Sequence, residues 1–150
     1  MMRSPGQSNP SGSGPSFSAY LTNPQSVTNA TETKVTLDTV EFNLGGAFSA
    51  GRFTPLVAGY YMVQASGRGA GTTVTQVWFT VRKNGAVFAR VVEDSAGGVT
   101  NSGGCMVYLN GSTDYIELYG FVNCAGTPTF DTLTTTGAFG PRLAAYLVRV

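Results

Sequence analysis

Histidine is absent from all 150 residues of this chain, and cysteine occurs only twice, at Cys105 and Cys124. Without an imidazole the chain cannot build a Ser-His-Asp triad, and it lacks the ligand that most zinc sites use. The two cysteines do not form a CxxC pair, so we interpret them as reduced, buried thiols that pack as small apolar side chains. Their spacing leaves open whether they ever pair.

Charged residues are also scarce. They make up 11% of the chain, with nine Lys and Arg against eight Asp and Glu, for a net charge of +1, whereas about 25% is usual. A net charge this small produces only a weak electrostatic field, which does not favour nucleic acid as a partner. No run approaches the ~18 apolar residues that a membrane helix needs, so we expect no membrane insertion. The first residues lack the apolar core of a secretory signal, and we expect no export signal.

Motifs for catalysis are missing as well. The sequence GRGAG at residues 67–71 lacks the Lys-Ser/Thr ending of a phosphate-binding loop. The acidic residues are dispersed, and the only adjacent pair is Glu93 and Asp94. This pair could contribute oxygen ligands to a calcium site, but we favour a solvated strand end. We therefore expect no enzyme activity, no catalytic residues, no metal and no cofactor.

The residues that are plentiful favour β-structure. Twenty glycines and recurring Thr and Val favour many short strands and turns. Apolar and polar residues alternate with a period of two at 17–22, 31–40, 59–65, 74–83, 86–93, 105–109, 114–122 and 143–150. Asn84-Gly85 predicts a type I′ hairpin turn. We predict an all-β, two-sheet antiparallel jelly-roll sandwich over residues 17–150, preceded by an extended polar arm at 1–16.

One stretch, residues 40–65, carries a recognisable motif. Asn43, Phe48, Phe53, Gly59 and Tyr61 follow one another as Asn-x4-Phe-x4-Phe-x5-Gly-x-Tyr. This order resembles the signature of the complement C1q-like branch of the tumour necrosis factor jelly-roll superfamily. The text LNGSTDYIELYGF at 109–121 and the closing apolar strand are also similar to that family, so the resemblance extends over about residues 17–150.

The expected strands carry more apolar surface than one sandwich can bury. Both faces of residues 114–122 are largely apolar, and contiguous exposed apolar patches usually mark an interface. Trp78 falls on the outer face of its strand, where it packs either on a loop of the same chain or on another subunit. The resemblance implies a homotrimer formed through an aromatic-lined sheet. Our candidates for this interface are Tyr20, Tyr61, Tyr115, Tyr119, Phe121 and Tyr146.

The polar arm has no periodic apolar positions. Its composition alone predicts a flexible arm, which would be ordered only where something outside its own fold holds it. We expect it to contact a neighbouring subunit or a larger protein assembly, such as a phage capsid or tail, through Arg3, Pro5, Pro10 and Pro15.

Three functions fit these features. The favoured one is a virion structural protein, a trimeric decoration or cement protein on a bacteriophage particle that is assembled in the host cytoplasm. The first alternative is a receptor-binding knob of a phage fibre, whose loops at 67–73 and 95–104 contact a host-surface saccharide or protein. The second is a secreted C1q-like adhesion module, although residues 1–15 lack the glycine at every third position that marks a collagen stalk.

Overall fold

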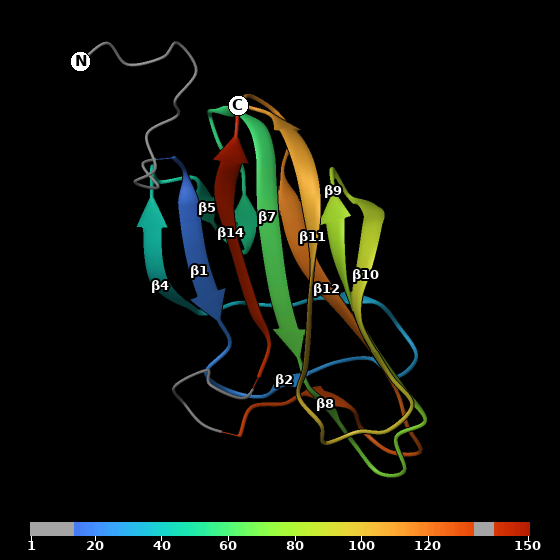
Figure 1. The fold of residues 1–150 in the computed structure, drawn as a ribbon. Coiled ribbons are helices and arrows are strands. Elements are labelled where there is room, and N and C mark those ends of the chain that lie inside the picture. Colours follow the sequence, from blue (N-terminus) through green and yellow to red (C-terminus); the bar gives the residue numbers. More distant parts are fainter. Residues whose placement is uncertain (1–13, 134–139) are drawn as a thin grey trace, which may run out of the picture.

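A computed structural model describes residues 14–133 and 140–150, and in it two antiparallel sheets pack face to face (Figure 1). The first, which we call sheet I, has the strand order β11-β7-β14-β1-β4. Its strands are β11 (Asn101–Asn110), β7 (Ala58–Gly67), β14 (Arg142–Arg149), β1 (Ser16–Tyr20) and β4 (Thr39–Leu44). Strands from both ends of the chain and from its middle therefore lie side by side.

The second sheet, sheet II, has the order β10-β9-β12-β6-β5, with β3 also paired to β12. Its strands are β10 (Ala86–Asp94), β9 (Gln76–Lys83), β12 (Ile116–Asn123), β6 (Arg52–Phe53), β5 (Phe48–Ser49) and β3 (Thr33–Lys34). Three short strands, β2 (Gln25–Ser26), β13 (Thr129–Phe130) and β8 (Gly69–Ala70), form a small third sheet at the lower end in Figure 1. The predicted all-β jelly-roll sandwich is confirmed.

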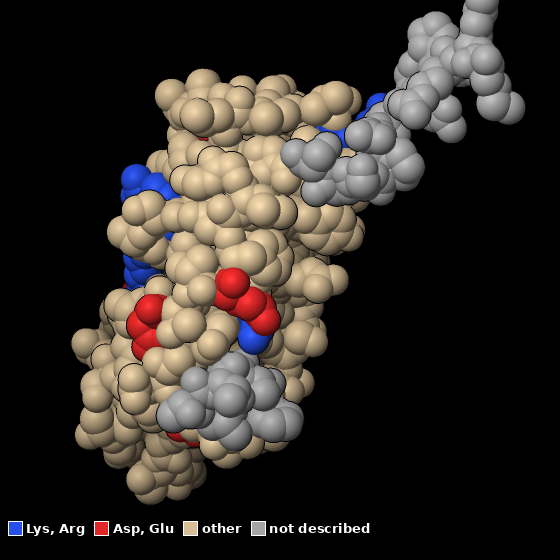
Figure 2. Space-filling model, turned by 90° about the vertical axis from the view of Figure 1, so that its left-hand side faces the viewer, with Lys and Arg blue, Asp and Glu red and all other residues tan. Residues whose placement is uncertain are grey.

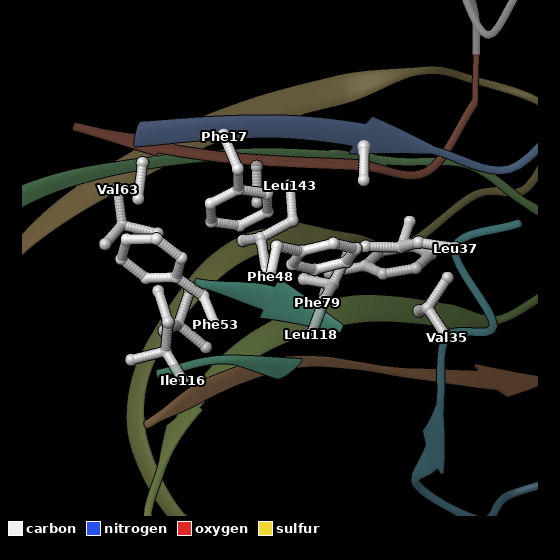
Figure 3. Close-up of a cluster of buried hydrophobic side chains, with 14 of the residues drawn as sticks. Phe17, Val35, Leu37, Phe48, Phe53, Val63, Phe79, Ile116, Leu118 and Leu143 are labelled. Atoms are coloured by element: carbon white, nitrogen blue, oxygen red, sulfur yellow. The ribbon is translucent and has the colours of Figure 1, made fainter. Parts of the chain in front are cut away.

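The core is formed by every second residue of the strands. Along β7, Tyr61, Val63 and Ala65 are buried while Tyr60 and Gln64 are exposed, because successive side chains of a strand point to opposite faces. Figure 3 shows side chains from both sheets meeting between them. The fully buried large side chains include Phe17, Phe53, Tyr61, Phe79, Phe130, Leu109, Ile116, Leu118 and Leu143. Burial of each of these side chains contributes roughly 1.5–3 kcal/mol to the stability of the folded state.

The prediction of one strand over residues 31–40 is wrong. The chain instead forms β3 in sheet II, crosses to the other layer, and forms β4 in sheet I. Val35 and Leu37 lie in the crossing segment, and both are buried. They alternate in sequence like strand residues because the crossing backbone is extended and its inner side faces the core.

The hairpin prediction at Asn84-Gly85 agrees with the backbone. Asn84 has φ +53° and Gly85 has φ +83°, as a type I′ turn requires. The Asn84 side chain donates to Asp114 at 2.7 Å, which ties the turn to the loop before β12. This hydrogen bond and one from Lys83 hold the pKa of the Asp114 carboxyl below its usual value.

Within the part of the chain that the structure describes, no helix is long and apolar enough to cross a membrane.

Candidate functional site

The five motif residues form one structural unit rather than a binding site. The ring of Phe17 stacks on Phe48 and Phe53, with centroids 4.4 and 4.6 Å apart. Phe53 in turn meets Tyr61 edge to face at 5.5 Å. The buried Tyr61 hydroxyl donates to Val57 O at 2.8 Å, and burial raises the pKa of Tyr61 to about 12. These aromatic residues link sheet I to sheet II.

Gly59 and Asn43 fix the backbone around this aromatic cluster. A Cβ on Gly59 would lie 2.4 Å from Arg149 O and 2.8 Å from the Leu147 side chain, so only glycine lets β14 pass this close. The Asn43 amide bonds both backbone polar groups of Phe48. The motif therefore specifies how β4, β7 and β14 pack around the aromatic cluster.

Interaction surfaces must then come from the outer faces of the two sheets. On sheet I, many of the side chains that point away from the core are apolar, and among the described residues several of them are about half exposed. The residues 43–55% exposed here are Phe42, Leu44, Tyr60, Met106, Tyr108, Tyr146 and Val148. We call this set the sheet I patch.

Strand register makes the sheet I patch continuous. Tyr108 pairs with Tyr60, and their rings meet at 5.4 Å. Met62 pairs with Met106 on one side and Tyr146 on the other. Beside these rings, Met62, Gln64, Ser102, Gly103 and Gly104 line a shallow hollow of about 300 Å³. Contiguous exposed apolar patches of this kind usually mark interaction sites.

The outer face of sheet II also carries aromatic rings, but side chains of the same chain cover them. Trp78 and Phe121, which are cross-strand partners, stack with centroids 3.6 Å apart and an interplanar angle of 3°. The Arg90 guanidinium lies over Trp78 at 4.2 Å. The guanidiniums of Arg52 and Arg82 lie over Tyr115 and Tyr119 at 3.8 and 4.1 Å.

Two carboxylates, Glu117 and Glu32, bind the Lys and Arg side chains on this face. Glu117 is only 3% exposed and accepts from Lys34 at 2.7 Å and from Arg52 at 3.2 Å. Glu32 accepts from the Trp78 indole at 3.0 Å and from Arg82. Burial alone would raise the pKa of Glu32, but these hydrogen bonds and the nearby arginine hold it below the usual value.

The six residues predicted for the trimer interface do not lie together. Tyr20 and Tyr146 are on the outer face of sheet I, where Tyr146 is 51% exposed. Tyr115, Tyr119 and Phe121 belong to the covered outer face of sheet II. Tyr61 is fully buried, so its assignment to an interface is wrong. The alternation of β7 already placed Tyr61 on the core side.

The sequence interpretation missed most of the sheet I patch. Tyr60, Met106 and Tyr108 were not selected, although each alternates with buried residues of its own strand. That alternation was the available signal, because an apolar residue opposite a core position must be exposed unless something covers it. Trp78 was predicted outside the core, and it packs on Glu32 of a neighbouring loop.

Of the predicted arm residues, Arg3, Pro5 and Pro10 lie outside the described residues. Pro15 is half-buried beside Gly45. Gly14 lies against the side chain of Leu147. The arm therefore joins the fold at the end of the sandwich where β14 terminates (Figure 1).

The two loops proposed to touch a host surface are neighbours at the opposite end. Gly98 donates to Gly69 O at 2.9 Å, and Arg68 bonds Asp131 at 2.8 Å and Gly98 O. Parts of both segments are strands, since residues 69–70 form β8 and residues 101–104 open β11. The structure therefore brings the two segments together.

Glu93 and Asp94 do not converge. Glu93 pairs with Arg90 at 3.3 Å. Asp94 accepts from Ala96 N at 3.0 Å and from Asn101 at 2.7 Å. Over residues 14–133 and 140–150 no three potential metal ligands gather. The geometry matches a capped strand end.

One cysteine lies on a strand and the other in a loop. Cys105 is half-buried on β11 and Cys124 is buried just after β12. Burial raises the pKa of the Cys105 thiol, so it is a poor nucleophile at neutral pH.

A further hollow of about 410 Å³ lies between residues 34–38 and the turn at Ala50 and Gly51. Its two charged side chains already have partners in the chain, since Asp38 accepts from Thr22 and Lys34 donates to Ala50 O and Glu117.

Known proteins of similar fold agree with this architecture. The globular domain of zebrafish complement 1qA protein is 17% identical, covers 90% of this chain and 98% of its own, and has a TM-score of 0.59. Murine APRIL is 14% identical, with coverage of 89% and 98% and a TM-score of 0.61. The Eiger TNF of S. frugiperda is 10% identical, with coverage of 91% and 92% and a TM-score of 0.53.

Comparison of the sequence with protein families identifies the family of this chain. No curated protein matches the chain in sequence. The family model for the C1q domain matches residues 16–129, a range that holds the whole Asn43 to Tyr61 motif and every strand except β13 at its edge and β14 beyond it. The chain therefore belongs to the C1q domain family.

Proposed function

We propose that the chain assembles as a homotrimer through the sheet I patch and acts as a non-enzymatic structural subunit. The observation that carries this is the contrast between the two outer faces. Tyr146, Tyr108 and Met106 stand uncovered on sheet I, whereas the rings of Tyr115, Tyr119 and Trp78 on sheet II are covered by arginines of the same chain. Sheet II exposes Val87 and Phe88 on its edge strand β10, but the sheet I patch is the larger set of apolar side chains that a second copy would remove from water.

The trimer is the closed assembly that the resemblance to C1q-like proteins implies. An obligate interface of this kind buries about 2,000–5,000 Å², and apolar area removed from water contributes roughly 25 cal/mol per Å². Charge does not oppose contact between copies, because all residues of the sheet I patch are uncharged, and the surface that Figure 2 shows from the side is also mostly uncharged. The pair of Arg142 and Glu41 at 2.6 Å is already neutralised within one copy.

We propose further that this trimer decorates a bacteriophage particle and attaches through residues 1–16. The arm joins the sandwich at Gly14 and Pro15, beside Leu147 and Gly45. Rotational symmetry keeps equivalent points at one level along its axis, so three arms would leave the trimer at the same end. Three polar arms in this arrangement suit attachment at a three-fold position of a shell.

Two measurements test these steps separately. Sedimentation equilibrium of the purified chain is expected to give a trimer, and a monomer at all concentrations would end the assembly proposal. For the second step, the full chain is mixed with capsids that lack decoration. The full chain is expected to bind and to raise the capsids' resistance to heat, and a chain lacking residues 1–16 is expected to stay trimeric without binding.

Other results would redirect the second step. Binding of the truncated chain to capsids would remove the arm from the attachment. Binding to host cells in place of capsids would support the receptor-binding knob. Binding to neither would leave the secreted adhesion module as the better account.

A further inference from the structure

We infer that Gln64 determines how the copies align in the trimer, by bonding to Gln64 of the two neighbouring copies in a ring of three amides. The inference rests on the proposed function, because it requires the sheet I patch to be the contact between copies. It adds a specificity-determining residue to that contact. In coiled coils, a single polar residue in an apolar interface selects the register and the number of chains at a cost in stability.

Gln64 stands next to the apolar part of the outer face of sheet I. It follows Met62 along β7, two residues and about 7 Å away, on the side opposite to the buried Val63. Its cross-strand partners are Gly104 on β11 and Ala144 on β14. Both partners are small, so the exposed Gln64 side chain rises above the residues beside it.

A copy that covers the sheet I patch must also cover Gln64. Met62 pairs with Met106 and with Tyr146, two members of the patch, and these three form the row of side chains immediately beside the row of Gln64. Two shallow hollows of about 300 and 150 Å³ border Gln64. Side chains of a second copy can enter this space, so the amide would leave water when the trimer forms.

Among the described residues, the chain offers this amide no hydrogen-bond partner of its own. Polar side chains nearby are bonded elsewhere, since Ser66 donates to Gly140 O at 2.8 Å and Arg142 donates to Glu41 at 2.6 Å. A primary amide carries two donors and an acceptor, and leaving them unpaired in a covered interface would weaken association. The partner must therefore come from another copy.

Rotational symmetry supplies that partner. Equivalent residues of a three-fold assembly lie at one level along its axis, so three Gln64 side chains can meet there. Each amide donates to the next copy and accepts from the previous one, which satisfies one donor and the acceptor in every copy. A copy displaced by two residues along its neighbour would place the amide against Met62, where no polar group receives it. The ring therefore selects one alignment.

The test compares two variants of the full chain with the same change of charge. Q64E replaces the amide on sheet I, and Q76E replaces an exposed glutamine at the start of β9 on sheet II. Sedimentation equilibrium over a dilution series measures trimer dissociation of both variants and of the native chain at pH 8 and pH 4. Circular dichroism at each pH checks that the chains remain folded.

At pH 8, Q64E should dissociate at concentrations at least about tenfold higher than the native chain does, because three carboxylates meet and none can donate a hydrogen bond. Like charges raise the pKa of such a carboxyl, so association should strengthen as pH falls. At pH 4 the protonated carboxyl donates and accepts as the amide does, which should bring Q64E within about threefold of the native chain. Q76E should match the native chain within about twofold at both pH values.

A third variant, Q64L, removes the hydrogen bonds and keeps a side chain of comparable size. Without the ring, native mass spectrometry should detect other oligomers beside the trimer, although association persists. A Q64L chain that forms trimers alone would overturn the role of Gln64 in alignment. Q64E that behaves like Q76E, or that stays dissociated at pH 4 while folded, would show that the three side chains do not meet.

These outcomes are separate from those that test the proposed function. A native chain that is monomeric at every concentration ends the trimer proposal and this inference together. A native trimer that Q64E and Q76E leave equally intact ends this inference alone.

Discussion

The side-chain amide of Asn43 pairs with the backbone of Phe48 at both ends. Its Nδ2 donates to Phe48 O at 2.9 Å, and the Phe48 N–H donates to its Oδ1 at 3.0 Å. The amide thus replaces a strand partner where the chain turns through Gly45 and Gly46, both of which have positive φ. It sets Phe48 where its ring stacks on Phe17.

Asn43→Ala should therefore destabilise the fold without changing its surface. Two hydrogen bonds to a half-buried turn are lost, and we expect the free energy of unfolding to fall by about 1–3 kcal/mol. Urea unfolding measures this, with Asn23→Ala as the control. Among the described residues the Asn23 amide bonds the exposed Thr22 hydroxyl alone, and its loss should cost less than about 0.5 kcal/mol. Equal stability of the two variants would show that the hydrogen bonds between the Asn43 amide and the Phe48 backbone do not stabilise the fold.

Gly59→Ala should be more damaging than glycine substitution at a turn. A Cβ at Gly59 would meet Arg149 O at 2.4 Å, whereas at Gly46, with φ +65°, it would meet nothing within 4 Å. Gly46→Ala is expected to cost about 1 kcal/mol from backbone strain alone. Gly59→Ala must also displace the end of β14, and we expect about 2 kcal/mol or more. Thermal unfolding of both variants decides this, and a milder effect at Gly59 would show that β14 can move away freely.

The sequence predicted the layers of this fold better than its surfaces. Alternation alone assigned Val77, Phe79 and Val81 to the core and Trp78 to the outside, as the structure has them. Alternation says nothing of what covers an outward ring. Tyr119 is covered because β9 pairs with β12 in a register that brings Arg82 over it. That register depends on non-local pairing, which no local pattern contains.

The motif at residues 43–61 shows a second limit of prediction from the sequence, because it names a position without giving the surroundings of its side chain. The resemblance placed Tyr61 in the family motif, but aromatic character led to its assignment to an interface. Its hydroxyl bonds Val57 O inside the core, which lets a tyrosine occupy a position that otherwise suits phenylalanine. The crossing from β3 to β4 escaped prediction for a related reason. Its inward residues, Val35 and Leu37, repeat at strand spacing.

Tyr61 should also make stability fall at high pH. Burial raises its pKa from 10.0 to about 12, so between these values the folded state keeps a proton that the unfolded state has lost. The stabilisation is complete below pH 10 and is lost as pH rises toward 12, by about 2–3 kcal/mol in all. Unfolding of the native chain and Tyr61→Phe is compared at pH 8 and near pH 12, so that other groups cancel. A constant difference between the two proteins would show that Tyr61 titrates normally when folded.

The two outer faces should respond differently to loss of one ring each. Tyr146 is half-exposed in the centre of the sheet I patch, so Tyr146→Ala should remove about 1.5–3 kcal/mol from each contact between copies and dissociate the trimer at higher protein concentration. Tyr119 lies against Arg82 of its own chain, so Tyr119→Ala should lower the melting temperature and leave association unchanged. Sedimentation across a dilution series separates these effects. Dissociation by Tyr119→Ala with an unaffected Tyr146→Ala would place the contact between copies on sheet II.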